Sequence, residues 1–375
     1  MEIIKNTAKH IRKYEDIILV VMFAILVAIS FINETLYETA GRYSSLFMFL
    51  VLGTLVAAHL GDIFRNKDLR FAAFIFIGIA AMANLVILNS KKGAVLIPTD
   101  LSLIVLAASY VRLKEKAAFF ISACGSILTL IWYADVRWSY NFNMAGLTFM
   151  LFMIMGVIFL QLLKERTEYD YLTCVQVLMF VTAFIYATLY HSRCAMAGIA
   201  AFGLFFALGF LIERSGILFT SLLILTTVGS LIFTIVYVVI AGKGMNATFL
   251  YKDLISGRHL IWKELWGAFL EHPLTGIGSS YELKSFEIFE VHNGFLDLLT
   301  VHGIIVFFPL FILILSGVNN AWLSLKEKES SLAVPRMALA ALFAMFVASF
   351  FENFFITPPY SAFFLFFLLL IHSDL

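Results

Sequence analysis

Long apolar runs recur along nearly the whole chain, and they restrict the fold more than any other feature does. A run of about 17 to 25 apolar residues is long enough to cross a bilayer as an α-helix. Because no water solvates the backbone inside a bilayer, only helices and closed barrels can cross it. We therefore expect an all-α polytopic membrane protein with about 12 transmembrane helices. The expected spans are Ile17–Ile32, Ser44–Leu60, Phe71–Leu88, Val95–Val111, Ala117–Ala134, Met144–Leu163, Leu172–Tyr190, Ala195–Ile212, Ile217–Ala241, Ile304–Leu323, Met337–Phe355 and Tyr360–Ile371.

The composition agrees with this fold class and excludes several kinds of partner. The chain is 62% hydrophobic and 14% charged, where a soluble domain carries about 25% charged residues. Its net charge of +1, without a basic cluster, argues against nucleic acid. Cys124, Cys174 and Cys194 lie in or beside apolar runs, so they predict neither a disulfide framework nor a thiolate metal site.

Lys and Arg residues in the connections predict how the chain crosses the membrane, since cytoplasmic connections carry more of them than external ones. With the N-terminus in the cytoplasm, 16 of the 26 Lys and Arg residues lie in cytoplasmic segments. Both termini then face the cytoplasm, and Lys91 and Lys92 break the pattern locally. The basic segment Met1–Asp16 resembles the charged region of a signal peptide, but no small-residue cleavage site follows Phe31. We interpret the first run as an anchor in the cell membrane.

One polar stretch, residues 242–303, is far too long for a turn between two spans. Connections of roughly 60 residues in a compact protein usually carry function. We expect one integral membrane domain, residues 1–375, with residues 242–303 as an extracytoplasmic insertion. Within it, a turn at Leu274–Gly278 and a second helix from Asn293 lead into the tenth span.

The first half of this long loop predicts an amphipathic helix. We expect it from about Gly257 to Glu271, with Ser256 as its cap. Its apolar residues recur about every four positions, and Trp262 and Trp266 lie beside them. This pattern predicts a helix at the membrane surface, with its Trp and Phe side chains in contact with lipid.

Two arginines are candidates for binding an anion at the outer face. Arg193 is expected at the start of the eighth span and Arg258 in the first turn of the loop helix. Helix N-termini offer unpaired N–H groups and a partial positive charge, so two such arginines can clamp a diphosphate. The alternative for each residue is an interfacial arginine that extends towards lipid headgroups.

His292, at the other end of the loop, is a candidate base near neutral pH. The alternative is a histidine that caps a helix or packs at an interface. Five histidines are expected on the outer side, but none of their spacings resembles a metal-ligand pair, so we expect no metal and no cofactor. The acidic residues of the loop are further candidates that nothing in the sequence ranks: Glu271, Glu282, Glu287, Glu290 and Asp297.

The apolar spans are nearly free of ionisable side chains. His59, Asp100 and Glu352 lie near predicted ends of spans. Transporters usually mark their pathway with charged residues or broken helices in mid-membrane. Their scarcity here favours chemistry at the outer headgroup level over transport.

These motifs resemble the O-antigen ligase and O-antigen polymerase superfamily. Ser192-Arg193, opening a helix of small residues, is similar to that family's Ser-Arg-Gly segment. The run from Ser256-Gly257-Arg258 through His272-Pro273-Leu274-Thr275-Gly276-Ile277-Gly278 to His292-Asn293-Gly294-Phe295-Leu296-Asp297 looks like its signature outer loop. One departure is Cys194, where the family often has Gly, and this raises a question about the local backbone.

The resemblance implies a membrane glycosyltransferase of the GT-C type, with an undecaprenyl-diphosphate-linked glycan as donor. It implies that Arg193 and Arg258 engage the diphosphate and that His292 lies beside the acceptor. Two arginines can stabilise the charge that develops on a diphosphate leaving group without a metal. One base for the acceptor hydroxyl then completes an inverting displacement.

We expect a polymerase that extends a surface polysaccharide, such as capsule, exopolysaccharide or O-antigen, by its repeat units. The alternative is a ligase that transfers the finished glycan to a lipid or protein acceptor, since both enzymes would share the donor site. A flippase for lipid-linked oligosaccharides would need polar residues lining a central cavity. A structural scaffold would leave Arg193, Arg258 and His292 unexplained.

Overall fold

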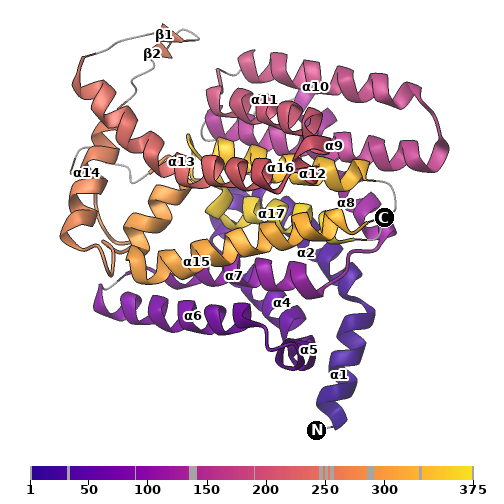
Figure 1. The fold of residues 1–375 in the computed structure, drawn as a ribbon, viewed down its shortest axis with the longest axis horizontal. Helices are drawn as coiled ribbons and strands as arrows, with labels where there is room; N and C mark the ends of the chain where they lie inside the picture. The colour runs from indigo at the N-terminus through magenta and orange to yellow at the C-terminus, as the bar shows by residue number, and fades with distance from the viewer. Residues whose placement is uncertain are drawn as a thin grey trace.

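The computed structural model describes residues 2–31, 34–88, 90–134, 142–189, 191–244, 248–249, 252–253, 257–284, 291–328 and 332–373. These residues form a helical bundle with one small antiparallel hairpin (Figure 1). The elements before the long loop are α1 (Glu2–Lys13), α2 (Glu15–Phe31), α3 (Glu34–Ala40), η1 (Gly41–Tyr43), α4 (Ser44–Ala58), α5 (Leu60–Arg65), α6 (Leu69–Ile87), α7 (Gly93–Tyr110), α8 (Glu115–Ala134), α9 (Phe142–Thr167), α10 (Tyr171–Leu189), α11 (Arg193–Ala207), α12 (Gly209–Arg214) and α13 (Gly216–Gly242). The remaining elements are β1 (Thr248–Phe249), β2 (Lys252–Asp253), α14 (Arg258–Glu271), α15 (Gly294–Lys326), α16 (Ala333–Ala348), η2 (Phe354–Ile356) and α17 (Pro358–His372).

The described residues of each predicted span lie mostly in helices, which confirms an all-α polytopic membrane protein. Among the described residues, 8 helices are long and apolar enough to cross a membrane, or up to 9 if the bent pair α1–α2 forms one span. Helices α11, α16 and α17 are apolar but shorter. Two predicted boundaries were wrong: the eighth span breaks at Leu208 into α11 and α12, and the eleventh ends at Ala348 rather than Phe355. The count of twelve stays a prediction.

The helices differ in how much of their surface other helices cover. Nearly every residue of α16 and α17 is buried, and these helices occupy the centre of the bundle in Figure 1. In α6 and α10 only 17% and 22% of the apolar segment is buried. Exposed apolar faces of that extent suit helices that contact lipid. The hairpin of α16 and α17 is therefore the core, and Pro358 and Pro359 start its second helix as predicted.

The loop helix α14 packs on protein, which makes the prediction of a lipid-facing helix wrong for its aromatic side. Ile261, Trp262 and Leu265 are buried in a small apolar cluster against α13, and Trp262 is 0% exposed. Phe269 is buried as well. Since the apolar side of α14 covers α13 and the start of α15, the loop has its own core.

The predicted turn at Leu274–Gly278 is confirmed, and it fits a kink in α15. Gly276 and Gly303 both have positive φ angles, 76° and 68°. At the kink, Ile304 N–H donates to Pro273 O at 2.9 Å, while Ile277 N–H donates to Thr300 O at 2.9 Å. The turn thus supplies hydrogen-bond partners that the kinked helix lacks internally.

The loop elements and the C-terminus lie on opposite sides of the bundle. In Figure 1, α14 and the β1–β2 hairpin lie at the left of the view, and the C-terminus lies at the right. Ion pairs follow the same division: Arg12–Asp62, Lys114–Asp16, Arg166–Glu115 and Arg336–Glu213 join segments predicted on the cytoplasmic side.

Candidate functional site

Two of the three predicted site residues, from the two ends of the long loop, meet on one carboxylate. Arg258 Nη2 donates to Glu352 Oε1 at 2.5 Å. His292 Nδ1 lies 2.8 Å from Glu352 Oε2. The Glu352 side chain is 2% exposed, whereas those of Arg258 and His292 are each 18% exposed. The carboxylate is thus the inner member of the group, and the basic side chains lie between it and the surface.

Local backbone structure places Arg258 and His292. Arg258 is the first residue of α14, after the cap residue Gly257. His292 has a φ of 54°, a left-handed conformation that is uncommon outside glycine. On one side of it, Trp262 Nε1 donates to Val291 O at 2.7 Å. On the other, the Asn293 side chain caps α15 by accepting from Leu296 N–H at 2.9 Å, as the sequence predicted.

Glu352 lies in the connection between α16 and α17, so the core hairpin of the bundle carries it to the loop. Asn143, at the start of α9, donates from Nδ2 to Glu352 Oε1 at 3.1 Å. Gly294 N–H donates to Ser349 O at 3.1 Å, which joins the start of α15 to the end of α16. Arg258, His292 and Asn143 therefore converge on Glu352 from three separate parts of the chain.

Arg193, the third predicted residue, belongs to the same neighbourhood. It begins α11 as predicted, and the Ser192 side chain caps that helix. Burial lowers the pKa of Arg193 from its ordinary value, and the positive charge of Arg258 lowers it further. Ser192 Oγ donates to Asn143 O at 3.3 Å, so the cap contacts the residue that also binds Glu352. Cys194 fits the helix, with its buried Sγ 3.3 Å from Ala348 O.

The other acidic candidates of the loop do not share this position. Glu271 and Glu282 are exposed. Asp297 Oδ2 accepts from Asn353 Nδ2 at 3.1 Å, one residue along from Glu352. Glu287, Glu290 and the predicted cap Ser256 lie outside the described residues. Among the residues that are described, no group of three or more His, Cys, Asp and Glu side chains could hold a metal ion.

Sequence reasoning missed Glu352 and Asn143 as parts of the site. An ionisable residue inside an otherwise apolar span is itself a signal of function, and Glu352 gave that signal without a partner. Its partners lie 94 and 60 residues away in sequence, so only the fold brings them together. Asn143 gave no signal that distinguishes it from an ordinary polar residue at a helix start.

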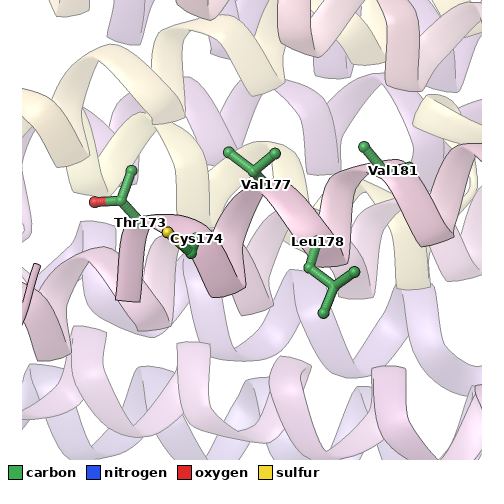
Figure 2. Close-up of a pocket in the computed structure, with 5 residues that line it drawn as sticks. All are labelled: Thr173, Cys174, Val177, Leu178 and Val181. Atoms are coloured by element: carbon green, nitrogen blue, oxygen red, sulfur yellow. The ribbon is translucent and has the colours of Figure 1, made fainter. Parts of the chain in front are cut away.

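A surface recess elsewhere in the bundle differs from this site in character. It lies on α10 and is lined by Thr173, Cys174, Val177, Leu178 and Val181 (Figure 2). Its volume is about 370 Å³ and its lining carries no charge. Val177 and Leu178 are 58% and 62% exposed. This is the open apolar face of a candidate span, which suits contact with lipid chains.

Comparison with protein families identifies the part of the chain that carries the loop. Residues 178–311 match the family model of the O-antigen ligase. This segment is similar to the O-antigen ligase family. The match runs from α10 into α15 and includes Arg193, Arg258 and His292. It confirms the superfamily resemblance predicted from the motifs. Glu352 and Asn143 lie outside the matched O-antigen ligase segment. No curated protein and no solved structure gave a significant match.

Proposed function

We propose that this protein is a membrane glycosyltransferase that uses an undecaprenyl-diphosphate-linked glycan as donor and polymerises a surface polysaccharide. The observation that carries the proposal is the shared carboxylate, since Arg258 and His292 both contact Glu352. The O-antigen ligase match over residues 178–311 supports the reaction class.

The arginines act on the donor in this proposal. Arg193 and Arg258 each begin a helix, where backbone N–H groups and the helix dipole also favour an anion. The bond between the anomeric carbon and the diphosphate breaks in the reaction, and the leaving diphosphate gains negative charge. Two guanidinium groups stabilise that charge most strongly in the transition state, which is what accelerates the step.

His292 acts on the acceptor. With its proton on Nδ1 and directed at Glu352, the imidazole carries its lone pair on Nε2. Nε2 then takes the proton of the acceptor hydroxyl while that oxygen forms the new bond to the anomeric carbon. The carbon is attacked opposite the leaving diphosphate, so its configuration inverts.

The proposal includes a location and a topology. The reaction takes place at the outer face of the cytoplasmic membrane, with both termini in the cytoplasm and a GT-C-type bundle of twelve membrane helices. The separation of α14 from the C-terminus in Figure 1 supports this arrangement, as does the pairing of the predicted cytoplasmic segments among themselves. Membrane lipids surround the bundle, and the acceptor is a glycan.

A ligase that transfers the finished glycan to a lipid or protein acceptor is the alternative, supported by the description of the matching family. The test is deletion of the gene followed by sizing of the lipid-linked glycan. Accumulation of single repeat units identifies a polymerase, and long chains retained on the polyprenyl carrier identify a ligase. Normal polysaccharide on the cell surface would contradict both.

A further inference from the structure

We infer that Glu352 is a positioning residue that holds His292 and Arg258 in their reactive arrangement. The inference rests on the proposed function, because it assigns a role within the same site. Glu352 touches neither reacting atom in the proposed reaction and acts through the two basic side chains.

The hydrogen bonds of Glu352 require a carboxylate at this position. Its Oε1 accepts from Arg258 Nη2 and from Asn143 Nδ2, and its Oε2 faces His292 Nδ1. Three donors thus converge on a group that offers only acceptors. A glutamine has one acceptor oxygen, and its NH₂ group would point a donor at another donor. Glutamine, although it has the same shape, therefore loses the hydrogen bonds at one of the two oxygen positions.

The burial of Glu352 strengthens the electrostatic interaction of its carboxylate with neighbouring charges. The residue is 1% exposed, and charges at hydrogen-bond distance interact more strongly away from water. Its negative charge offsets the positive charge of Arg258, which it contacts directly. It also fixes the proton of His292 on Nδ1, as a carboxylate does for a catalytic histidine in hydrolytic triads.

The experiment compares Glu352→Gln and Glu352→Asp with a matched control, Glu213→Gln. Glu213 forms a similar ion pair with Arg336, at 2.5 Å, away from the site. The substrate is lipid-linked glycan extracted from cells that lack the gene, and turnover is measured for each variant. We expect Glu352→Gln to reduce turnover about 10²-fold or more, as for loss of an oriented base. Glu352→Asp should recover part of the turnover, because it restores the carboxylate, and Glu213→Gln should keep the turnover of the wild type.

A second readout does not depend on activity. Diethyl pyrocarbonate modifies imidazole nitrogens, so the rate of His292 modification at one fixed pH, followed by mass spectrometry, should be higher in Glu352→Gln, where no carboxylate holds the ring. The double variant Glu352→Gln/His292→Ala should lose less turnover relative to His292→Ala than Glu352→Gln loses relative to the wild type, because the part of the effect that acts through His292 is already absent. An inactive wild-type protein would contradict the proposed function. An active wild type with unchanged turnover and an unchanged rate of His292 modification in Glu352→Gln would overturn the positioning role.

Discussion

At the scale of single residues, the site concentrates charge in a largely buried place. Arg258 and Glu352 form an ion pair whose carboxylate is 2% exposed. Removing one partner of a buried pair typically costs about 3 to 5 kcal/mol, because the other charge stays buried without compensation. Substitutions at Arg258 therefore affect folding as well as activity, and a test of its role must separate the two.

Both arginines are expected to be required for activity. Arg193→Ala and Arg258→Ala should each abolish product formation, since each removes a group that is proposed to bind the diphosphate. Arg258→Ala should also lower the unfolding temperature markedly, because it removes a partner of Glu352. Thermal unfolding in detergent, measured beside turnover, separates the effects. Lys at either position should restore part of the activity, since it keeps the charge but not the planar fork. Alanine variants with normal activity would leave both residues as interfacial arginines.

His292 is expected to affect turnover more than donor binding. His292→Ala should reduce turnover by about 10² to 10⁴, the usual contribution of general base catalysis, while the affinity for the lipid-linked donor changes little. His292→Asn should be nearly as slow, because an amide bonds to Glu352 but accepts no proton. Turnover and donor affinity of the purified variants test this. Near-normal turnover in His292→Ala would require a different base.

Local sequence patterns predict the site residues that lie at the start of a helix. Arg193, Arg258 and Asn293 each stand at a helix start that capping rules locate from sequence. Glu352 follows Phe350 and Phe351 in an apolar run, and nothing local distinguishes a site carboxylate there from one at a span end. Its role depends on partners from distant elements, which a single sequence does not specify.

At the scale of elements, the second half of the loop is fixed in place by the contact between the turn at Leu274–Gly278 and the kink of α15. A Cβ on Gly276 would lie 2.5 Å from Gly303 N, and one on Gly303 would lie 2.3 Å from Leu274 O. Asn84 Nδ2 donates to both Thr275 O and His302 O at 3.0 Å, which ties α6 to the same contact. The close packing of the turn against the kink therefore requires glycine at both positions, and the positions of the side chains on either side of the kink depend on it.

Gly276→Ala is expected to destabilise the protein and reduce activity. The added methyl group meets backbone atoms that cannot move aside, and the φ of 76° is unfavourable for alanine. We expect a lower unfolding temperature and lower turnover, measured on the same preparation. The matched control is Gly267→Ala in α14, where an added Cβ meets nothing within 4 Å. There alanine should stabilise the helix by about 1 kcal/mol. Equal stability of the two variants would contradict the tight contact.

The ends of an element can be predicted from the sequence where capping residues and turns mark them. What packs against the element cannot be predicted in this way. The helix over residues 258–271 was expected within one residue of its observed start. Its apolar side was assigned to lipid, because an amphipathic pattern shows that a face is apolar but not what covers it. In the fold Phe233 and Tyr237 of α13 cover Trp262.

At the scale of the whole molecule, the arrangement of charged connections predicts which end faces the cell exterior. The test uses a variant without the native cysteines, since Cys174 is exposed. A cysteine at Ser280, exposed in the loop, should react with an impermeant thiol reagent in intact cells. One at Asp170, whose side chain is 93% exposed between α9 and α10, should react only after the cells are opened. The reverse pattern would overturn the proposed orientation.

The place of Glu352 in the chain has a consequence for biosynthesis. Membrane helices are inserted from the N-terminus onward during translation, and α16 and α17 are the last helices that the structure describes. A nascent chain that has inserted everything up to α15 already contains Arg193, Arg258 and His292, but it lacks the carboxylate that two of them contact. An unfinished chain of this kind would therefore hold the proposed donor-binding arginines without the proposed positioning carboxylate. On the proposed function, a chain truncated before α16 should be inert even though it retains the long loop.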